Sequence, residues 1–283
     1  MPFTVPIKDA QANFPEYKFI KALTPSEQKA AFHVQNSDGE DLCLKIIAPN
    51  YSVDRLQREI IALQTLNHPN VVKLQEYTYS STPTQQRHYM IEDFIEGDDL
   101  SDRLLAGVPW SRIEVADFFI PLTEGLNALS EAKIVHRDLK PNNIRVRQNG
   151  SPVIIDFGLA RHLDKSDITL TAQGAAIGTP VYFAPEQFTG TKREIDHRTD
   201  IFAIGIIMYQ ALTGNHPFAQ PSQTYQQLSD AICSSDAHLN TPEFLGLPNQ
   251  WRLLLTRLLE KERGKRIQNA KQVSTILQKI GGV

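Results

Sequence analysis

The sequence reads HRDLKPNN at residues 136–143 and, after a short spacer, IIDFG at residues 154–158. Phosphoryl transfer requires a carboxylate near the attacking hydroxyl, oxygen ligands for magnesium, and a cation that shares the charge of the transferred phosphate. The two stretches supply side chains of these types at Asp138, Lys140, Asn143 and Asp156. A single polar triplet would be weak evidence. All eight residues 136–143 fit a known phosphoryl-transfer motif, and the strand and Asp-Phe-Gly that follow them indicate the same chemistry.

Further stretches extend this pattern toward both ends of the chain. They read LCLKI at 42–46, REII at 58–61, GTPVYFAPE at 178–186 and DIFAIG at 200–205. With the first two stretches they resemble the motif set of the eukaryotic-like, bacterial-type Ser/Thr protein kinase domain, over nearly the whole chain. The resemblance implies a single kinase domain over residues 1–282 with an α+β, bilobal fold. We expect a small β-rich N-lobe with one helix (about 12–95) and a larger, mainly α-helical C-lobe (about 96–282).

The resemblance also implies catalytic roles for particular residues. Asp138 would accept or orient the proton of the substrate hydroxyl, and Lys140 would stabilise the transferring phosphate. Asn143 and Asp156 would hold Mg2+ through hard oxygen ligands. His136 is better interpreted as a packing residue than as an acid or base, because an interior histidine beside a catalytic loop usually positions its neighbours.

ATP binding is implied for residues of both lobes. Lys45 would bind the phosphates, and Glu59 would provide its counter-charge from a helix. The full set of ATP-binding candidates is Ala31, Cys43, Lys45, Glu59, Glu92, Asp93, Ile95, Asp99 and Arg145.

The same resemblance implies an activation segment between Asp156 and Glu186. Arg137 precedes the catalytic aspartate, as in kinases that a phosphate in this segment switches on. We expect Thr169 or Thr171 to be autophosphorylated, although both can also be ordinary solvated loop residues. Structural roles in and around the segment are implied for Arg137, Thr179, Glu186, Asp200 and Arg266, with Arg266 pairing with Glu186.

The turn that covers the phosphates in this family departs from the Gly-x-Gly-x-x-Gly pattern. Here Thr24, Ser26 and Lys29 stand where the glycines belong. Glycine allows backbone N–H groups to approach phosphates, whereas Pro25 has no N–H. We therefore expect the turn to contribute less than a glycine-rich one, leaving Lys45 and Mg2+ to carry most of the phosphate binding. Lys29 could take part through its side chain or could be a solvated lysine.

Three candidate pocket residues are also unusual for the family. Glu92 lies where most members have an apolar or hydroxyl residue, Cys43 replaces a common alanine, and Arg145 takes a position that usually packs under adenine. A buried Glu92 should pair with Lys45 or another cation, or be protonated. The aliphatic stem of Arg145 can cover a flat ring while its head reaches water.

The composition is ordinary for a soluble globular protein. Hydrophobic residues make up 41%, charged residues 22%, and the net charge is −3, which predicts neither nucleic acid nor a membrane as a partner. Two cysteines are too few for a disulfide framework, no apolar run is long enough to span a membrane, and the N-terminus does not resemble a signal peptide. We therefore expect a cytoplasmic protein without a membrane segment. The expected partners are protein substrates and a transient second copy for trans-autophosphorylation.

Hydrophobic periodicity predicts most of the secondary structure, with an irregular leader over residues 1 to about 15. Strands are expected at 17–23, 30–35, 41–47, 72–77 and 89–92. The expected helices lie near 56–66, from the capping box Ser111/Glu114 to about 132, and at 200–212, 224–232, 250–259 and 271–280.

Three functions remain open on the sequence alone. The first is an active, magnesium-dependent Ser/Thr protein kinase. The second is a pseudokinase that senses nucleotide or acts as a scaffold, which the missing glycines suggest. The third, a small-molecule phosphotransferase with a related core, is disfavoured by the intact stretch from Thr179 to Glu186, which builds a peptide-docking surface in protein kinases.

Overall fold

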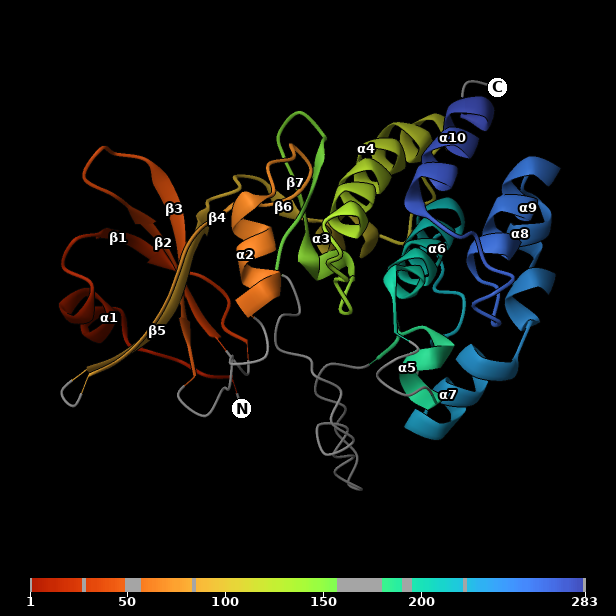
Figure 1. Cartoon of the computed structure of the whole chain (residues 1–283). Coiled ribbons are helices and arrows are strands. Elements are labelled where there is room, and N and C mark those ends of the chain that lie inside the picture. Colours follow the sequence, from red (N-terminus) through yellow and green to blue (C-terminus); the bar gives the residue numbers. More distant parts are fainter. Residues whose placement is uncertain are drawn as a thin grey trace. The chain divides into compact units, whose positions relative to one another are not determined.

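The computed structural model describes residues 2–26, 29–48, 57–82, 85–156, 180–189, 195–220 and 223–281. The chain divides into two compact units, Met1–Glu96 and Gly97–Val283 (Figure 1). The first is built on an antiparallel sheet and the second mainly on helices, which confirms the expected α+β architecture. No helix in the described part of the chain is long and apolar enough to cross a membrane.

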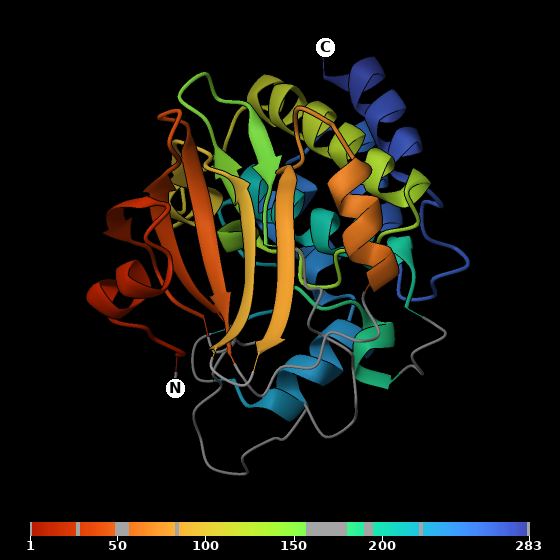
Figure 2. The same ribbon diagram turned by 60° about the vertical axis from the view of Figure 1, so that its left-hand side comes forward.

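The small unit contains one five-stranded sheet in the order β1-β2-β3-β5-β4. In Figure 2 the gold strand β5 lies between the red-orange β3 and the orange β4. Every neighbouring pair is antiparallel. The unit comprises α1 (Ile7–Asn13), β1 (Lys18–Ala22), β2 (Lys29–Gln35), β3 (Asp41–Ile47), α2 (Gln57–Thr65), β4 (Leu74–Thr82) and β5 (Gln85–Asp93).

The turn between β2 and β3 shows how the local sequence sets the register of the sheet. The Oδ1 atom of Asn36 accepts hydrogen bonds from the N–H groups of Asp38 and Glu40, at 3.0 and 2.9 Å. Gly39 adopts a φ of 80°, which glycine tolerates without strain. Such a turn fixes the pairing of the two strands, so that Ala31 lies opposite Lys45.

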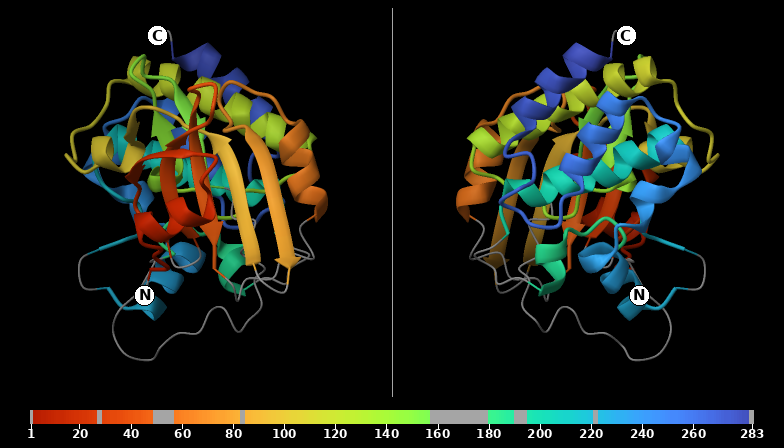
Figure 3. Two further views of the ribbon diagram at one scale, coloured as in Figure 1. Left: turned by 90° about the vertical axis from the view of Figure 1, so that its left-hand side faces the viewer. Right: turned by 90° about the vertical axis from the view of Figure 1, so that its right-hand side faces the viewer.

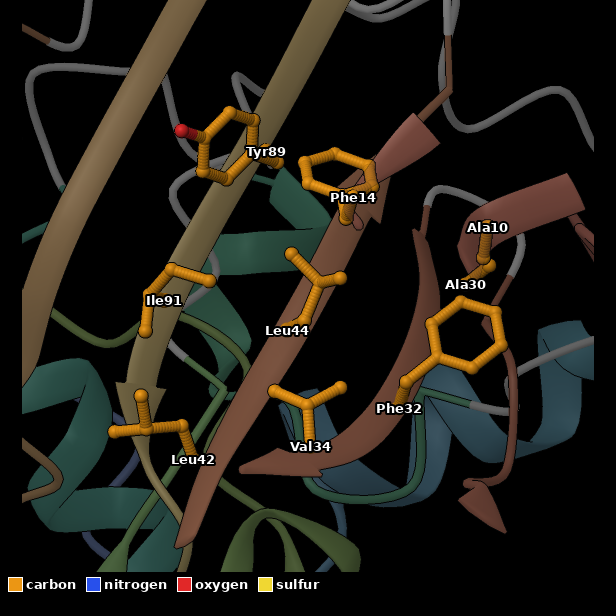
Figure 4. Packing of buried hydrophobic residues seen from close by; sticks show 9 residues of the cluster. All are labelled: Ala10, Phe14, Ala30, Phe32, Val34, Leu42, Leu44, Tyr89 and Ile91. Carbon is orange, nitrogen blue, oxygen red and sulfur yellow. The ribbon is translucent and has the colours of Figure 1, made fainter. Parts of the chain in front are cut away.

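The expected irregular leader is wrong, because residues 7–13 form helix α1. Ala10 and Phe14, four residues apart, are 0% and 2% exposed and belong to the core cluster of the sheet (Figure 4). The Phe14 ring packs edge to face on Tyr89, with centroids 4.9 Å apart. A helix of this length is not stable alone in water, so tertiary packing of this apolar stripe stabilises it.

Strand alternation gives the sheet two different faces. Phe32, Leu44 and Ile91 point into the core cluster that α1 covers (Figure 4). Their neighbours along the strands point to the opposite face, because successive side chains of a strand alternate. Lys45 and Glu92 lie on that opposite face and are buried, at 5% and 4% exposure.

The large unit combines a short three-stranded sheet, in the order β6-β7-β8, with a group of helices. Its elements are β6 (Asp98–Asp99), α3 (Leu100–Leu104), α4 (Arg112–Glu131), η1 (Pro141–Asn143), β7 (Ile144–Val146), β8 (Pro152–Ile154), α5 (Pro185–Thr189), α6 (His197–Thr213), α7 (Tyr225–Ser234), η3 (Ala237–Asn240), α8 (Pro242–Leu245), α9 (Asn249–Leu258) and α10 (Ala270–Ile280).

Helix α4 begins at the predicted capping box. The Glu114 N–H donates to Ser111 Oγ at 3.2 Å, and the Ser111 N–H donates to Glu114 Oε2 at 2.8 Å. The hydroxyl and N–H of Ser111 lower the pKa of the Glu114 carboxyl. Helix α10, dark blue in both views of Figure 3, packs along α4. An added Cβ at Gly281 would lie only 2.2 Å from that of Ala116, so the end of α10 depends on this glycine.

Helix α6 is the central buried helix of the large unit. Most of its residues are buried on every side, from Thr199 to Thr213. It begins at the cap Asp196, whose side chain accepts from the Arg198 N–H, and ends at Gly214 with a φ of 74°. It carries Asp200, which organises the segment described next.

Candidate active site

The segment after α4 is held in an irregular conformation by a buried carboxylate. Asp200, on α6, accepts from the N–H groups of His136 (2.8 Å) and Arg137 (2.9 Å). Arg137 has a φ of 65°, which a residue with a Cβ adopts only at a cost of about 1 kcal/mol or more. Burial raises the pKa of Asp200, although the N–H groups of His136 and Arg137 that donate to it act in the opposite direction. The carboxylate compensates for the strained backbone and fixes the start of the loop.

His136 is fully buried, at 0% exposure, and connects two parts of the loop. Its Nε2 lies 3.0 Å from the carbonyl oxygen of Ile155, and its Nδ1 lies 3.3 Å from the N–H of Asp138. A carbonyl can only accept and an N–H can only donate, so Nε2 faces an acceptor and Nδ1 faces a donor. Both ring nitrogens therefore hold neighbours in place, which fits the packing role expected from the sequence.

Asp138, Lys140 and Asn143 converge on one carboxylate oxygen. Lys140 Nζ lies 2.9 Å from Asp138 Oδ2. Asn143 Nδ2 donates to the Asp138 carbonyl oxygen at 2.7 Å and reaches Oδ2 at 3.3 Å. The side chains of Asp138 and Lys140 remain 16% and 30% exposed, so both can meet a ligand. The short helix η1, which begins at Pro141, closes this arrangement through Asn143 N–H to Lys140 O at 2.9 Å.

Asp156 follows β8 and lies next to the same loop. The Ile155 N–H donates to the Asn143 carbonyl oxygen at 3.0 Å, which joins the end of β8 to the end of η1. Asp156 has a φ of 56° and is half-buried. Phe157 and the candidates Thr169, Thr171 and Thr179 lie outside the described residues.

Glu186 and Arg266 form the buried ion pair that the resemblance implies. Two Arg266 nitrogens, Nη1 and Nη2, donate to the two carboxylate oxygens at 2.8 and 3.1 Å. The hydroxyl of Thr199 adds a third contact at 2.9 Å. Burial alone would raise the pKa of Glu186, but Arg266 outweighs it and lowers the pKa. A paired carboxylate at this depth anchors α5 to α6 and to the chain before α10.

Gln187 is a structural residue that sequence reasoning missed. Its Nε2 donates to the Arg137 carbonyl oxygen at 2.9 Å, and its Oε1 accepts from the Ala184 N–H at 3.0 Å. It is 5% exposed. Gln187 thus connects α5 directly to the loop of Arg137 and Asp138. Only its position directly after Glu186 in the sequence could have drawn attention to it.

In the small unit, Lys45 and Glu92 form a buried ion pair with 2.6 Å between Nζ and Oε2. Their side chains are 6% and 5% exposed. The pairing confirms the expectation that a buried Glu92 needs a cation. Cys43 lies directly opposite Glu92 in the sheet, so it faces the same side. Glu59 belongs to α2, but its side chain lies outside the described residues.

The remaining candidates are placed as follows. Ala31 lies opposite Lys45 on β2, and the N–H of Asp93 donates to the Lys73 carbonyl oxygen while its Oδ1 accepts from Gln75 Nε2 at 2.6 Å. Ile95 is half-buried. The Arg145 side chain is 23% exposed, and its head has two partners within the protein. Its Nη1 pairs with Asp99 Oδ1 at 2.8 Å and its Nη2 contacts the Gly97 carbonyl oxygen, because β6 and β7 place Asp99 directly opposite Arg145.

Comparison with known proteins agrees with this geometry. Residues 29–278 match the model of the protein kinase domain. The chain therefore belongs to the protein kinase family. It is 28% identical over 250 residues to the "Probable serine/threonine-protein kinase PknB" of Bifidobacterium longum, which covers 84% of this chain and 35% of that protein.

Two further relatives extend the comparison to other bacteria. The serine/threonine-protein kinase PknB of Mycolicibacterium smegmatis is 28% identical over 250 residues, covering 85% of this chain and 39% of the relative. A serine/threonine-protein kinase of Myxococcus xanthus is 31% identical over 256 residues, covering 86% and 30%. The chain thus spans between 30% and 39% of the length of these three curated relatives.

Proposed function

We propose that this chain is a Ser/Thr protein kinase, which transfers the γ-phosphate of ATP to hydroxyl groups of protein substrates. The observation that carries the proposal is the convergence of Lys140 Nζ and Asn143 Nδ2 on Asp138 Oδ2, in a loop that Asp200 holds in place. The Asp138 carboxylate, the Lys140 ammonium and the Asn143 amide are the kinds of group that phosphoryl transfer requires, and they are positioned together before any ligand binds.

Asp138 orients the substrate hydroxyl and accepts its proton late in the transfer. A carboxylate suits this task because a loose transition state demands little proton transfer before the bond to phosphorus forms. Lys140, whose ammonium group already lies beside Asp138, shares the charge of the transferring phosphoryl group. A lysine at this position also favours Ser/Thr over Tyr substrates, as the resemblance implies.

Asn143 and Asp156 are the residues that would hold Mg2+. The Nδ2 of Asn143 is directed at Asp138, so its Oδ1 is turned to the other side of the planar amide, where it can act as a ligand. No group of three or more His, Cys, Asp or Glu that could hold a metal occurs among the described residues. The donor set of one carboxylate and one amide oxygen fits Mg2+, which usually takes one or two carboxylates together with substrate phosphates. Bound Mg2+ and ATP supply the reactive phosphoryl group and neutralise its charge.

Lys45 binds the ATP phosphates from the small unit, and Glu92 holds it in place. A lysine kept charged at 5% exposure needs a counter-charge, which Glu92 provides from the neighbouring strand. The role of Glu59 as a second counter-charge stays a prediction. Nucleotide contacts of Ala31, Cys43, Asp93, Ile95, Asp99 and Arg145 also remain part of the proposal, with the Asp99 carboxylate already engaged by Arg145.

The pseudokinase alternative has less support. Every candidate for the transfer step is present in the sequence, from Lys45 to Asp156, and the three relatives described above are named as kinases. Regulation by autophosphorylation at Thr169 or Thr171, assisted by a transient homodimer, belongs to the proposal. So does a cytoplasmic location, which the two free cysteines, Cys43 and Cys233, support.

Transfer of labelled phosphate to a generic protein substrate tests the proposal. Asp138→Asn and Asp156→Asn should each lower the rate by orders of magnitude, because each removes a positioned charge from the reaction. Asp117→Asn is the matched control, since Asp117 is an exposed carboxylate on α4. Near-normal rates for Asp138→Asn or Asp156→Asn would contradict the assigned roles. An inactive wild-type chain that still binds MgATP would favour the pseudokinase.

A further inference from the structure

The turn that replaces the glycine-rich turn is closed by its own hydrogen bonds. The Ser26 N–H donates to the Lys29 carbonyl oxygen at 2.9 Å, and the Lys29 N–H donates to Ser26 Oγ at 3.1 Å. Pro25 has no N–H. Pro25, Ser26 and Lys29 therefore offer no backbone N–H to a phosphate unless the turn opens. If the turn contacts phosphates, a side chain has to make the contact.

The N-terminal segment fixes this turn from outside. The Phe3 N–H donates to the Ser26 carbonyl oxygen at 2.8 Å. The side chains of Phe3 and Val5 pack against the same core cluster that α1 enters through Ala10 and Phe14 (Figure 4). These residues precede the part of the chain that matches the family model, which begins at Lys29. The segment thus anchors the β1–β2 turn to the core.

Lys29 is the first residue of β2, and its position along the strand sets the face to which it points. Ala30 and Phe32 point into the core cluster, so Lys29 and Ala31 point to the opposite face. Ala31 lies opposite Lys45, which makes Lys29 and Lys45 diagonal neighbours on that face. Diagonal neighbours of an antiparallel pair are about 7 to 8 Å apart. Two lysine side chains at this spacing can reach the same polyphosphate.

We infer that Lys29 is a second phosphate-binding residue of this kinase, held in place by the bond between Phe3 and Ser26. Its ammonium group replaces the contacts that backbone N–H groups make in a glycine-rich turn, and it binds the terminal phosphates of a nucleoside triphosphate beside Lys45. The inference rests on the proposed function. It gives the N-terminal segment a positioning role, because residues 3–14 hold the strand end from which Lys29 projects.

Calorimetric titration with MgATP and with adenosine tests the inference, since only ATP carries phosphates. Lys29→Gln should weaken MgATP binding about tenfold, the size of one charge-assisted hydrogen bond, and leave adenosine binding unchanged. Lys29→Arg should restore most of the MgATP affinity because it keeps the charge. Lys18→Gln is the matched control: it removes an exposed lysine from the other end of the β1–β2 hairpin, opposite Gln35, and should change neither titration.

Phe3→Pro tests the positioning role, because it removes the N–H that Ser26 accepts. It should weaken MgATP several-fold while sparing adenosine, and it should have no further effect in a chain that already carries Lys29→Gln. Thr4→Pro is the control for the proline itself. Equal MgATP affinities of wild type and Lys29→Gln would overturn the inference, as would equal losses for MgATP and adenosine, which indicate a purely structural role. A wild-type chain that binds no MgATP would instead overturn the proposed function.

Discussion

Replacing Glu92 with leucine should destabilise the small unit by about 3 to 5 kcal/mol, because it leaves the Lys45 ammonium buried without this counter-charge. The distance of 2.6 Å and the exposures of 6% and 5% place the pair in the class for which losing one partner is costly. The loss has an upper limit. Lys45 can instead lose its proton, and bringing a lysine pKa from about 10.4 down to pH 7 costs about 4.6 kcal/mol. The two estimates agree.

The companion variants separate the ion pair from simple loss of packing. Lys45→Met alone should cost a similar amount, since it leaves the Glu92 carboxylate buried. The double variant Lys45→Met/Glu92→Leu should recover to within about 1 kcal/mol of wild type, because apolar residues of similar volume often replace a buried pair without loss. The coupling energy between the two positions is then about 5 kcal/mol or more.

Hydrogen exchange of the β3 and β5 amides is the suitable assay. Both tryptophans, Trp110 and Trp251, lie in the large unit, so their fluorescence does not report on the small one. Exchange measures the opening free energy of each strand directly. Glu96→Leu, which replaces an exposed glutamate after β5, is the control. A loss below about 1 kcal/mol for Glu92→Leu, or additive losses in the double variant, would refute Glu92 as the main counter-charge of Lys45.

Three further predictions concern the large unit and can all be followed by tryptophan fluorescence during urea unfolding. Arg266→Met should cost about 3 to 5 kcal/mol, because Glu186 then remains buried without its bidentate partner; a loss below about 1 kcal/mol would contradict this. Burial, with the charge of Lys261, lowers the pKa of His238 to about 3. His238 therefore binds a proton more tightly in the unfolded chain than in the folded one. Its contribution to the free energy of unfolding should be full above about pH 6.5 and fall by up to about 1.4 kcal/mol per pH unit toward pH 3. His238→Leu should flatten that slope, and an unchanged slope would contradict the assignment. Burial lowers the pKa of Lys261 to about 8. Its buried Nζ has no hydrogen-bond partner in the described part of the chain and lies over two aromatic rings, 4.1 Å from the centroid of Phe218 and 5.9 Å from that of Phe202. Lys261→Met should therefore be neutral or stabilising by about 1 kcal/mol at pH 7, and a clear loss would show that the contact with the rings outweighs burial of the charge.

The sequence predicts those features that depend on local pattern. Strand β3 occupies residues 41–47 as predicted, and α4 begins at the predicted capping box of Ser111. The ion pair of Lys45 and Glu92 was also predictable, because a carboxylate at a position that should be buried requires a cation.

Other features depend on contacts between residues far apart in the chain. Helix α1 is too short to be predicted from propensity, and only the packing of Ala10 and Phe14 on the sheet explains it. Gln187 reaches the carbonyl of Arg137 across fifty residues, which no local pattern encodes. The contact of Arg145 with Asp99 likewise depends on the register of β6 and β7.

The intact mass of the chain before and after incubation with ATP and Mg2+ tests the central claim most directly, because it reports phosphoryl transfer without any added substrate. Wild type should gain whole phosphate units, and peptide mapping should place them within residues 159–179. Asp138→Asn should gain none under the same conditions, whereas Asp117→Asn should match wild type. An unchanged wild-type mass together with no transfer to a protein substrate, or equal gains in wild type and Asp138→Asn, would contradict the account.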